Sequence, residues 1–303
     1  MKHHTSALTL LAVLMCGSAS AGDYYPYVSR NNAPPPYPAP APYLAPPPGL
    51  WTGFYAGLNL GGTFSGNGYV DTSTAAIAPT TPPMGFAFAS SASRLASLNN
   101  VGFIGGGQIG YNFQLSPVLI AGLEADIQGL TGSVAANQVG FSGGVLGSVP
   151  VTFGQIQRNL DYLGTVRARL GYLLTPTLLF YATGGLAYGG ANLQANYASF
   201  DAHNVFGPGV GATTLSDTAV GYSVGGGAEW MFLPNWSAKL EYLYYDLGSI
   251  STPGAAVVGA APAGIAPWAY SAKEVSRFNG HVIRAGVNYH FLFGAPPPVV
   301  GKY

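Results

Sequence analysis

Charged side chains are scarce in this 303-residue chain: Asp, Glu, Lys and Arg make up 7% of it, against about 25% in an ordinary soluble domain. The charges also cancel, with 11 Lys and Arg against 11 Asp and Glu, so no basic surface for nucleic acid is expected. The 20 Tyr and 15 Phe argue against disorder, because disordered chains are poor in aromatic residues. A neutral chain with 44 Gly and this aromatic content favours an all-β protein.

A long apolar run is also missing. The apolar stretch at 7–15 follows a basic residue and precedes the small residues 19–21, which is typical of a cleavable secretory signal over 1–21. It is shorter than the ~20 residues of a membrane-spanning helix, and no such helix is predicted. Cys16, the one cysteine, lies in this signal, so the exported chain is expected to lack disulfides. Acylation of Cys16 as a lipoprotein is the less favoured alternative.

A proline-rich arm follows the signal. Residues 22–50 contain two Pro-Pro-Pro runs and a Pro-Ala alternation, a composition that favours extended polyproline II geometry and cannot build a core. The favoured interpretation is a periplasmic spacer. The alternative is a docking strip for peptidoglycan or a periplasmic protein.

Eight segments with period-two alternation then follow, which is the pattern of β-strands with two different faces. They span 51–63, 102–114, 118–130, 160–174, 178–191, 219–233, 236–248 and 278–291. Three connections are tight turns, and four are long and rich in Ala, Ser, Thr and Gly: 64–101, 131–159, 192–218 and 249–277. The predicted fold is all-β: an eight-stranded antiparallel transmembrane β-barrel over 51–291, with four long extracellular loops and three short periplasmic turns.

The two faces of each segment differ in polarity. In 160–174, Arg167 and Arg169 share one face, while Val166 and Leu170 share the other. A soluble barrel usually carries its charges outside, and a continuous apolar outer surface would aggregate in water. We therefore expect the apolar face to contact outer-membrane lipid and the charged face to line the lumen.

Aromatic residues gather near the predicted strand ends, as expected where an amphipathic ring lies at headgroup depth. The expected girdle at the short-turn end comprises Trp51, Phe54, Tyr111, Tyr172, Trp230, Trp236, Tyr289 and Phe291.

The lumen of an eight-stranded barrel is just wide enough for side chains. Alternation places nine charges in it: Glu124, Asp126, Asp161, Arg167, Arg169, Glu229, Lys239, Glu241 and Arg284. Buried charges persist only when they are paired and hydrogen-bonded. We therefore predict an interior salt-bridge network that plugs the lumen. The alternative is a selectivity filter, in which the same charges line a conducting path.

The sequence shows no arrangement of residues that is typical of a catalytic site. The three histidines beyond the signal, His203, His281 and His290, are too far apart along the predicted barrel to converge on a metal ion, and no Ser lies two residues after His281 to act as a nucleophile beside it. His203, with Trp268 and Tyr270, is a weak candidate for a haem site in the loops. No enzymatic activity, metal or cofactor is predicted.

Three motifs carry a family resemblance: Trp-Thr-Gly-Phe-Tyr-Ala-Gly at 51–57, Leu-Gly-Thr-Val-Arg-Ala-Arg-Leu-Gly-Tyr at 163–172, and Val-Ile-Arg-Ala-Gly-Val-Asn-Tyr-His-Phe at 282–291. Over 51–291 the chain resembles the small outer-membrane β-barrel proteins of alphaproteobacteria, known as surface immunogenic or porin-family outer-membrane proteins. The resemblance implies an integral protein of the outer membrane with structural and surface-antigen roles, some members being reported as haem binders or porins.

In that family the assembly machinery reads the aromatic residue that ends the last strand. Here a C-terminal extension, 292–303, follows that residue, so either the internal strand or Tyr303 serves as the signal. The sequence as a whole predicts a structural barrel and surface antigen with a plugged lumen. The alternatives are a porin-like channel for small solutes, a surface protein that binds haem or another ligand, and an adhesin.

Overall fold

The computed structural model describes residues 50–66, 68–77, 82–99 and 101–291, all of which belong to one compact unit. The predicted signal, the arm up to residue 49 and the C-terminal extension lie outside the described residues.

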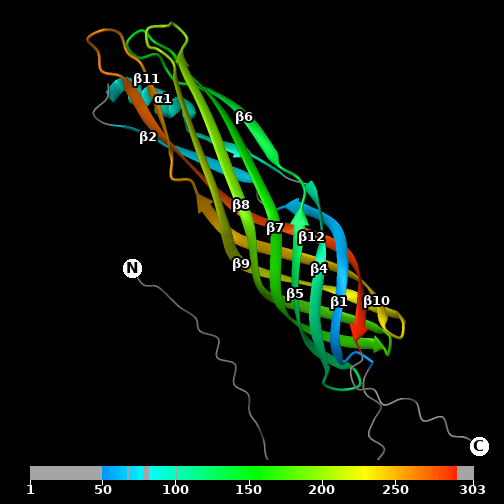
Figure 1. Ribbon diagram of the computed structural model, residues 1–303. Helices are drawn as coiled ribbons and strands as arrows, with labels where there is room; N and C mark the ends of the chain where they lie inside the picture. The colour runs from blue at the N-terminus through cyan, green and yellow to red at the C-terminus, as the bar shows by residue number, and fades with distance from the viewer. Residues whose placement is uncertain (1–49, 67, 78–81, 100, 292–303) are drawn as a thin grey trace, which may run out of the picture. The chain divides into compact units, whose positions relative to one another are not determined.

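Strands dominate this part of the chain (Figure 1). They are β1 (Gly53–Ser65), β2 (Tyr69–Ala76), β3 (Arg94–Ser97), β4 (Val101–Gln114), β5 (Leu119–Leu130), β6 (Val134–Phe141), β7 (Pro150–Thr175), β8 (Leu178–Asp201), β9 (Gly209–Leu233), β10 (Trp236–Ser251), β11 (Ala255–Gly259) and β12 (Trp268–Phe291), with one helix, α1 (Pro82–Ala92). Among the described residues, no helix is long and apolar enough to span a bilayer.

Eight of these strands form a closed antiparallel ring in the order β1-β4-β5-β7-β8-β9-β10-β12, and β12 pairs back onto β1 with Leu58 opposite Val287. The all-β barrel is therefore confirmed, and each predicted segment lies on one ring strand. Closure leaves no unpaired edge around the ring.

The prediction of four long loops is wrong over most of their length. β7, β8, β9 and β12 continue beyond the ring as an extension, in which β6 pairs with β7, β11 with β9 and β12, and β2 with β12 and β3. The hydropathy pattern failed here because the apolar residues of the extension face inward, whereas those of the ring face outward. On β7, Gln155 and Gln157 point outward while Ile156 is buried in the core of the extension.

Helix α1 was also not predicted. It contacts β2, β6, β7 and β12 in the extension, and Met84, Ala87, Phe88, Ala89 and Ala92 are all buried. Phe88 stacks on Trp268 with ring centroids 3.7 Å apart. A helix buried on most of its surface has no single apolar stripe, so its sequence lacks the usual helical signal.

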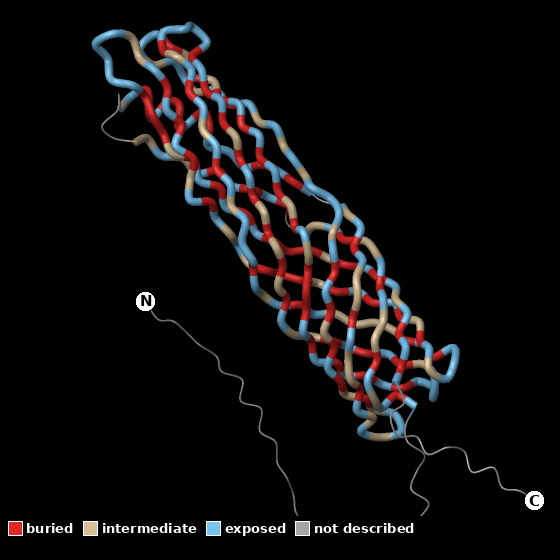
Figure 2. The backbone as a smooth tube through the Cα atoms, in the orientation of Figure 1, coloured by how far each residue is buried: buried red, intermediate tan, exposed pale blue. Residues whose placement is uncertain are grey.

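Around the ring the outer surface is apolar, and exposed and buried residues alternate along the strands (Figure 2). Leu58 is 73% and Leu60 is 72% exposed. The other large exposed side chains of this apolar belt include Ile109, Leu123, Ile127, Val166, Leu170, Leu186, Val224, Leu240, Ile283 and Val287. This distribution is inverted relative to a water-soluble barrel.

Candidate functional site: a buried charge cluster

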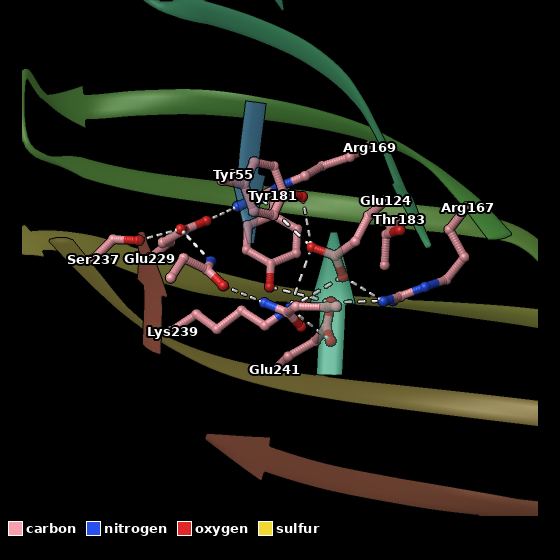
Figure 3. Close-up of polar contacts among 12 residues, drawn as sticks. Tyr55, Glu124, Arg167, Arg169, Tyr181, Thr183, Glu229, Ser237, Lys239 and Glu241 are labelled. Atoms are coloured by element: carbon pink, nitrogen blue, oxygen red, sulfur yellow. Dashed lines mark hydrogen bonds and ion pairs between the residues drawn. The ribbon is translucent and has the colours of Figure 1, made fainter. Parts of the chain in front are cut away.

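Eight of the nine predicted interior charges meet inside the ring. This charge cluster consists of Glu124, Asp126, Arg167, Arg169, Glu229, Lys239, Glu241 and Arg284, and none of them is more than 5% exposed. They come from β5, β7, β9, β10 and β12, whose alternation turns every second side chain inward. Figure 3 shows most of them pointing toward one another, joined by hydrogen bonds and ion pairs.

Strand register brings opposite charges face to face. Glu124 lies opposite Arg167, Glu241 lies opposite Arg284, and Glu229 lies opposite Lys239. Directly opposed residues on one face have neighbouring Cβ atoms, so the backbone pairing itself places these three cations beside a carboxylate.

Arg167 is bonded to three carboxylates at once. Its Nη2 lies 2.6 Å from Glu124 Oε1 and 2.7 Å from Asp126 Oδ2, and its Nη1 lies 3.1 Å from Glu241 Oε1. Its Nε donates to Thr165 Oγ1 at 2.8 Å. The guanidinium thus uses its planar fork in the way that suits arginine to buried ion pairs.

Arg284 and Lys239 complete the centre of the cluster. Arg284 donates from Nε to Glu241 Oε2 at 2.6 Å and from Nη2 to Asp126 Oδ2 at 2.9 Å. Lys239 Nζ lies 3.0 Å from Glu124 Oε1 and 3.6 Å from Glu241 Oε2. Each of these carboxylates is shared by at least two cations.

Arg169 and Glu229 form the part of the cluster nearer the short turns. Arg169 is ion-paired with Glu229, and its guanidinium lies 3.7 Å from the centroid of the Tyr181 ring. Glu229 also accepts hydrogen bonds from Ser237 Oγ at 2.5 Å and Asn288 Nδ2 at 2.7 Å.

Two tyrosines that were not predicted also join the cluster. Tyr55 on β1 donates to Glu124 Oε2 at 2.7 Å, and Tyr181 on β8 donates to Glu241 Oε1 at 3.1 Å. Gln108 on β4 bonds to Asn288 on β12, so every ring strand contributes a polar side chain to this level. Their inward position in the alternation was the signal that could have identified them.

Asp161 is the exception among the nine charges, and its predicted inward position is wrong. Its side chain is exposed and accepts hydrogen bonds from Asn159 at 2.5 Å and Asn192 at 2.6 Å. The β7–β8 register shifts between Leu160 and Leu163. A bulge of this kind reverses which side chains face inward, so Leu160 is buried and Asp161 points out.

Seven of the eight predicted girdle residues lie on the outer surface. Phe54, Tyr172 and Trp230 are each 56% exposed, and Tyr111, Trp236, Tyr289 and Phe291 are also partly or largely exposed. Trp51 was assigned wrongly: it is 1% exposed, and its Nε1 donates to the Pro176 carbonyl oxygen at 2.9 Å. It precedes the first ring strand, where the alternation that assigns faces has not yet begun.

Comparison of this sequence with known protein families also indicates an outer-membrane β-barrel. The family described as outer membrane protein beta-barrel domain matches residues 9–291. The 31 kDa outer-membrane immunogenic protein of Brucella melitensis is 33% identical over 289 residues, covering 94% of this chain and 98% of the relative. The chain belongs to the outer membrane β-barrel family.

A further relative and two solved structures share less sequence identity or less of their length with this chain. The 22 kDa outer membrane protein of Rhizobium leguminosarum bv. viciae is 31% identical over 48% of this chain and 53% of that protein. Among solved structures, OprG from Pseudomonas aeruginosa matches with 13% identity and a TM-score of 0.35, covering 79% of this chain and 97% of that one. Ail, the attachment invasion locus protein of Yersinia pestis, matches with 14% identity and a TM-score of 0.29, covering 78% and 99%. Neither structural likeness bears on function.

The family identity confirms integral localisation in the bacterial outer membrane. An outer membrane β-barrel contacts lipid with its outer surface, which accounts for the apolar belt around the ring.

The structure does not assemble the haem cradle that the sequence suggested. Trp268 and Tyr270 are 0% exposed and stack on each other inside the extension, whereas His203 is exposed and its Nδ1 lies 2.8 Å from the Gly147 carbonyl oxygen. The expectation of loop positions for the two aromatic residues is wrong because β12 begins at Trp268. Among the described residues, no three His, Cys, Asp or Glu side chains are grouped to hold a metal ion.

Proposed function

We propose that this outer-membrane protein is a structural barrel and surface antigen whose lumen is closed by the charge cluster. The eight ring strands span the membrane, the short turns face the periplasm, and the extension projects from the cell surface in place of the four predicted loops. The observation that carries the proposal is the balance of the cluster, in which four cations face four carboxylates with almost no exposed surface.

Electrostatics favours closure over conduction. A selectivity filter needs ion-accessible charges, with binding weak enough for the ion to leave. Here the carboxylates are already paired at hydrogen-bond distance with cations of the same protein, so an entering ion would have to displace a bonded side chain. Such a displacement would be costly, because removal of one partner of a buried ion pair leaves an uncompensated charge.

Apolar packing on both sides of the cluster supports the same conclusion. Towards the short turns, Trp51, Ile120, Leu173, Leu179 and Met231 pack together and are buried. Towards the extension, a second buried layer includes Ile104, Leu163, Leu243, Phe278 and Val282. Water and ions would have to cross both layers as well as the cluster.

The surface role rests on the relatives and on the extension. The Brucella relative is named as an immunogenic outer-membrane protein, and the extension, built on β7, β8, β9 and β12, presents a large ordered surface beyond the apolar belt. We further propose that β12 is read by the outer-membrane assembly machinery, and that the proline-rich arm is a periplasmic spacer, the alternative being contact with peptidoglycan or a periplasmic protein.

Permeability of reconstituted vesicles tests the proposal. The refolded protein is inserted into liposomes, and swelling is followed in isotonic solutions of small sugars, with an open porin as the positive control. We expect swelling no faster than in protein-free vesicles. Swelling at the rate of the porin would overturn the closed-lumen proposal and favour a solute channel.

A further inference from the structure

Among the residues that the structure describes, one buried cation lies outside the charge cluster and has no carboxylate partner. Arg158 on β7 is 7% exposed. Its Nη2 donates to the Arg277 carbonyl oxygen at 2.7 Å, and its guanidinium carbon lies 4.3 Å from the centroid of the Phe278 ring. Its Nη1 is buried without a hydrogen-bond partner.

This arrangement leaves the guanidinium of Arg158 without a bonded carboxylate. Glu274, which is also buried in the extension, is hydrogen-bonded to Tyr197 and Thr252 instead. The charge cluster is neutral as a set, with four cations and four carboxylates, so it offers Arg158 no surplus negative charge. The guanidinium does not lose its proton in proteins, and burial of an unpaired charge is costly. A contact with one aromatic face supplies part of the missing stabilisation, but it leaves Nη1 unbonded.

A small cavity lies beside this guanidinium. Its volume is about 30 Å³, and Arg158, Thr63, Tyr245, Leu160 and Phe278 line it. A cavity of this size holds one water-sized occupant. Three of the lining residues carry hydroxyl groups and five are apolar, so the surroundings combine polar groups with a low dielectric.

Two further apolar residues line the cavity: Leu98, just beyond the end of β3, and Val134, at the start of β6. In the part of the chain that the structure describes, these two strands are in contact but do not pair with each other. Leu98 is 1% exposed and belongs to the apolar core of the extension, against which Val134 packs.

We propose that this cavity binds one small monovalent inorganic anion of the size of chloride, which pairs with Arg158. The unpartnered Nη1 supplies the charged donor, and the volume excludes phosphate, carboxylates and larger solutes. The site uses none of the residues of the charge cluster, so it can be tested separately from closure by that cluster.

Halide titration of the full refolded chain in detergent tests this site. The midpoint of thermal unfolding is measured at constant ionic strength while sodium gluconate is replaced by sodium chloride or sodium bromide. We expect the midpoint of the wild type to rise and to saturate at millimolar halide. Arg158→Met is expected to lose this dependence, whereas Arg94→Met, which removes an exposed arginine, should retain it.

Two results would overturn the proposal: a wild-type midpoint that does not respond to halide below molar concentration, or an equal response in all three proteins. If Arg158→Met does not fold, bromide-soaked crystals of the wild type decide the question. An anomalous peak at hydrogen-bond distance from Arg158 Nη1 supports the site, and its absence from an otherwise ordered cavity refutes it.

Discussion

Replacing Arg167 with methionine should destabilise the barrel strongly. Methionine keeps much of the side-chain volume but removes contacts at 2.6, 2.7 and 3.1 Å to three carboxylates. The cluster would then hold four carboxylates against three cations. Because removing one partner of a buried ion pair costs about 3–5 kcal/mol, we expect the free energy of unfolding to fall by that amount.

A double-mutant cycle separates charge balance from lost packing. Glu241→Gln alone should also destabilise, because it leaves Lys239 and Arg284 with less negative charge beside them. The double variant Arg167→Met/Glu241→Gln restores equal numbers of each charge. The unfolding free energy of the double variant should therefore fall by less than the sum of the two single decreases. The expected difference is about 1–3 kcal/mol, the coupling typical of residues in one network.

Urea unfolding in lipid vesicles is the assay, followed by tryptophan fluorescence and by the heat-dependent shift in gel mobility. Arg277→Met is the matched control, because its side chain is 56% exposed although it is paired with Asp246, and water screens such a pair. If Arg167→Met is no more destabilising than Arg277→Met, the cluster is hydrated rather than buried, and the reasoning fails.

Three further predictions follow from single positions. A Cβ on Gly106 would lie 2.1 Å from a backbone oxygen of β5, whereas one on Gly105 meets its nearest atom at 3.6 Å, so Gly106→Ala should impair refolding yield and Gly105→Ala should not. Equal yields would contradict the close approach of β4 and β5. Phe88→Ala should remove the stack that holds α1 and cost about 3–5 kcal/mol, measured as faster proteolysis of the extension while the ring stays protected; unchanged cleavage would show that α1 does not support the extension. Burial alone would raise the pKa of Asp201, but four backbone N–H donors outweigh it and hold that pKa below its ordinary value. The stabilisation is therefore present above about pH 4 and lost as the pH falls through the lowered pKa, so Asp201→Asn should cost about 1–3 kcal/mol at pH 7 and progressively less in acid. A gap between wild type and variant that is constant with pH would contradict this assignment.

The membrane itself explains why the ring was predictable from sequence. Lipid on one side and packed polar groups on the other impose a strict alternation, and that alternation alone assigns Arg167, Arg169, Glu241 and Arg284 to one face. Which carboxylate each of these charges pairs with followed only from the strand register, because alternation assigns a side chain to a face and does not identify its neighbour.

Beyond the apolar belt, lipid no longer imposes this alternation on the strands. Asp161 was misplaced because a bulge shifts the register without any mark in the hydropathy pattern. Arg158 was assigned to a loop because the outer face of its strand carries Gln155 and Gln157 there and lacks the apolar residues that mark the ring strands. Helix α1 escaped notice because it is buried on most of its surface, where a helix shows no polar face.

Single-channel recording in a planar bilayer tests the central claim most directly, with refolded wild type beside an Arg167→Ala/Arg169→Ala variant. A plugged lumen predicts a silent wild type and a variant that leaks or fails to fold. Steady conductance by the wild type, with ion selectivity altered in the variant, would contradict closure by the charge cluster and make the same residues the lining of a pore.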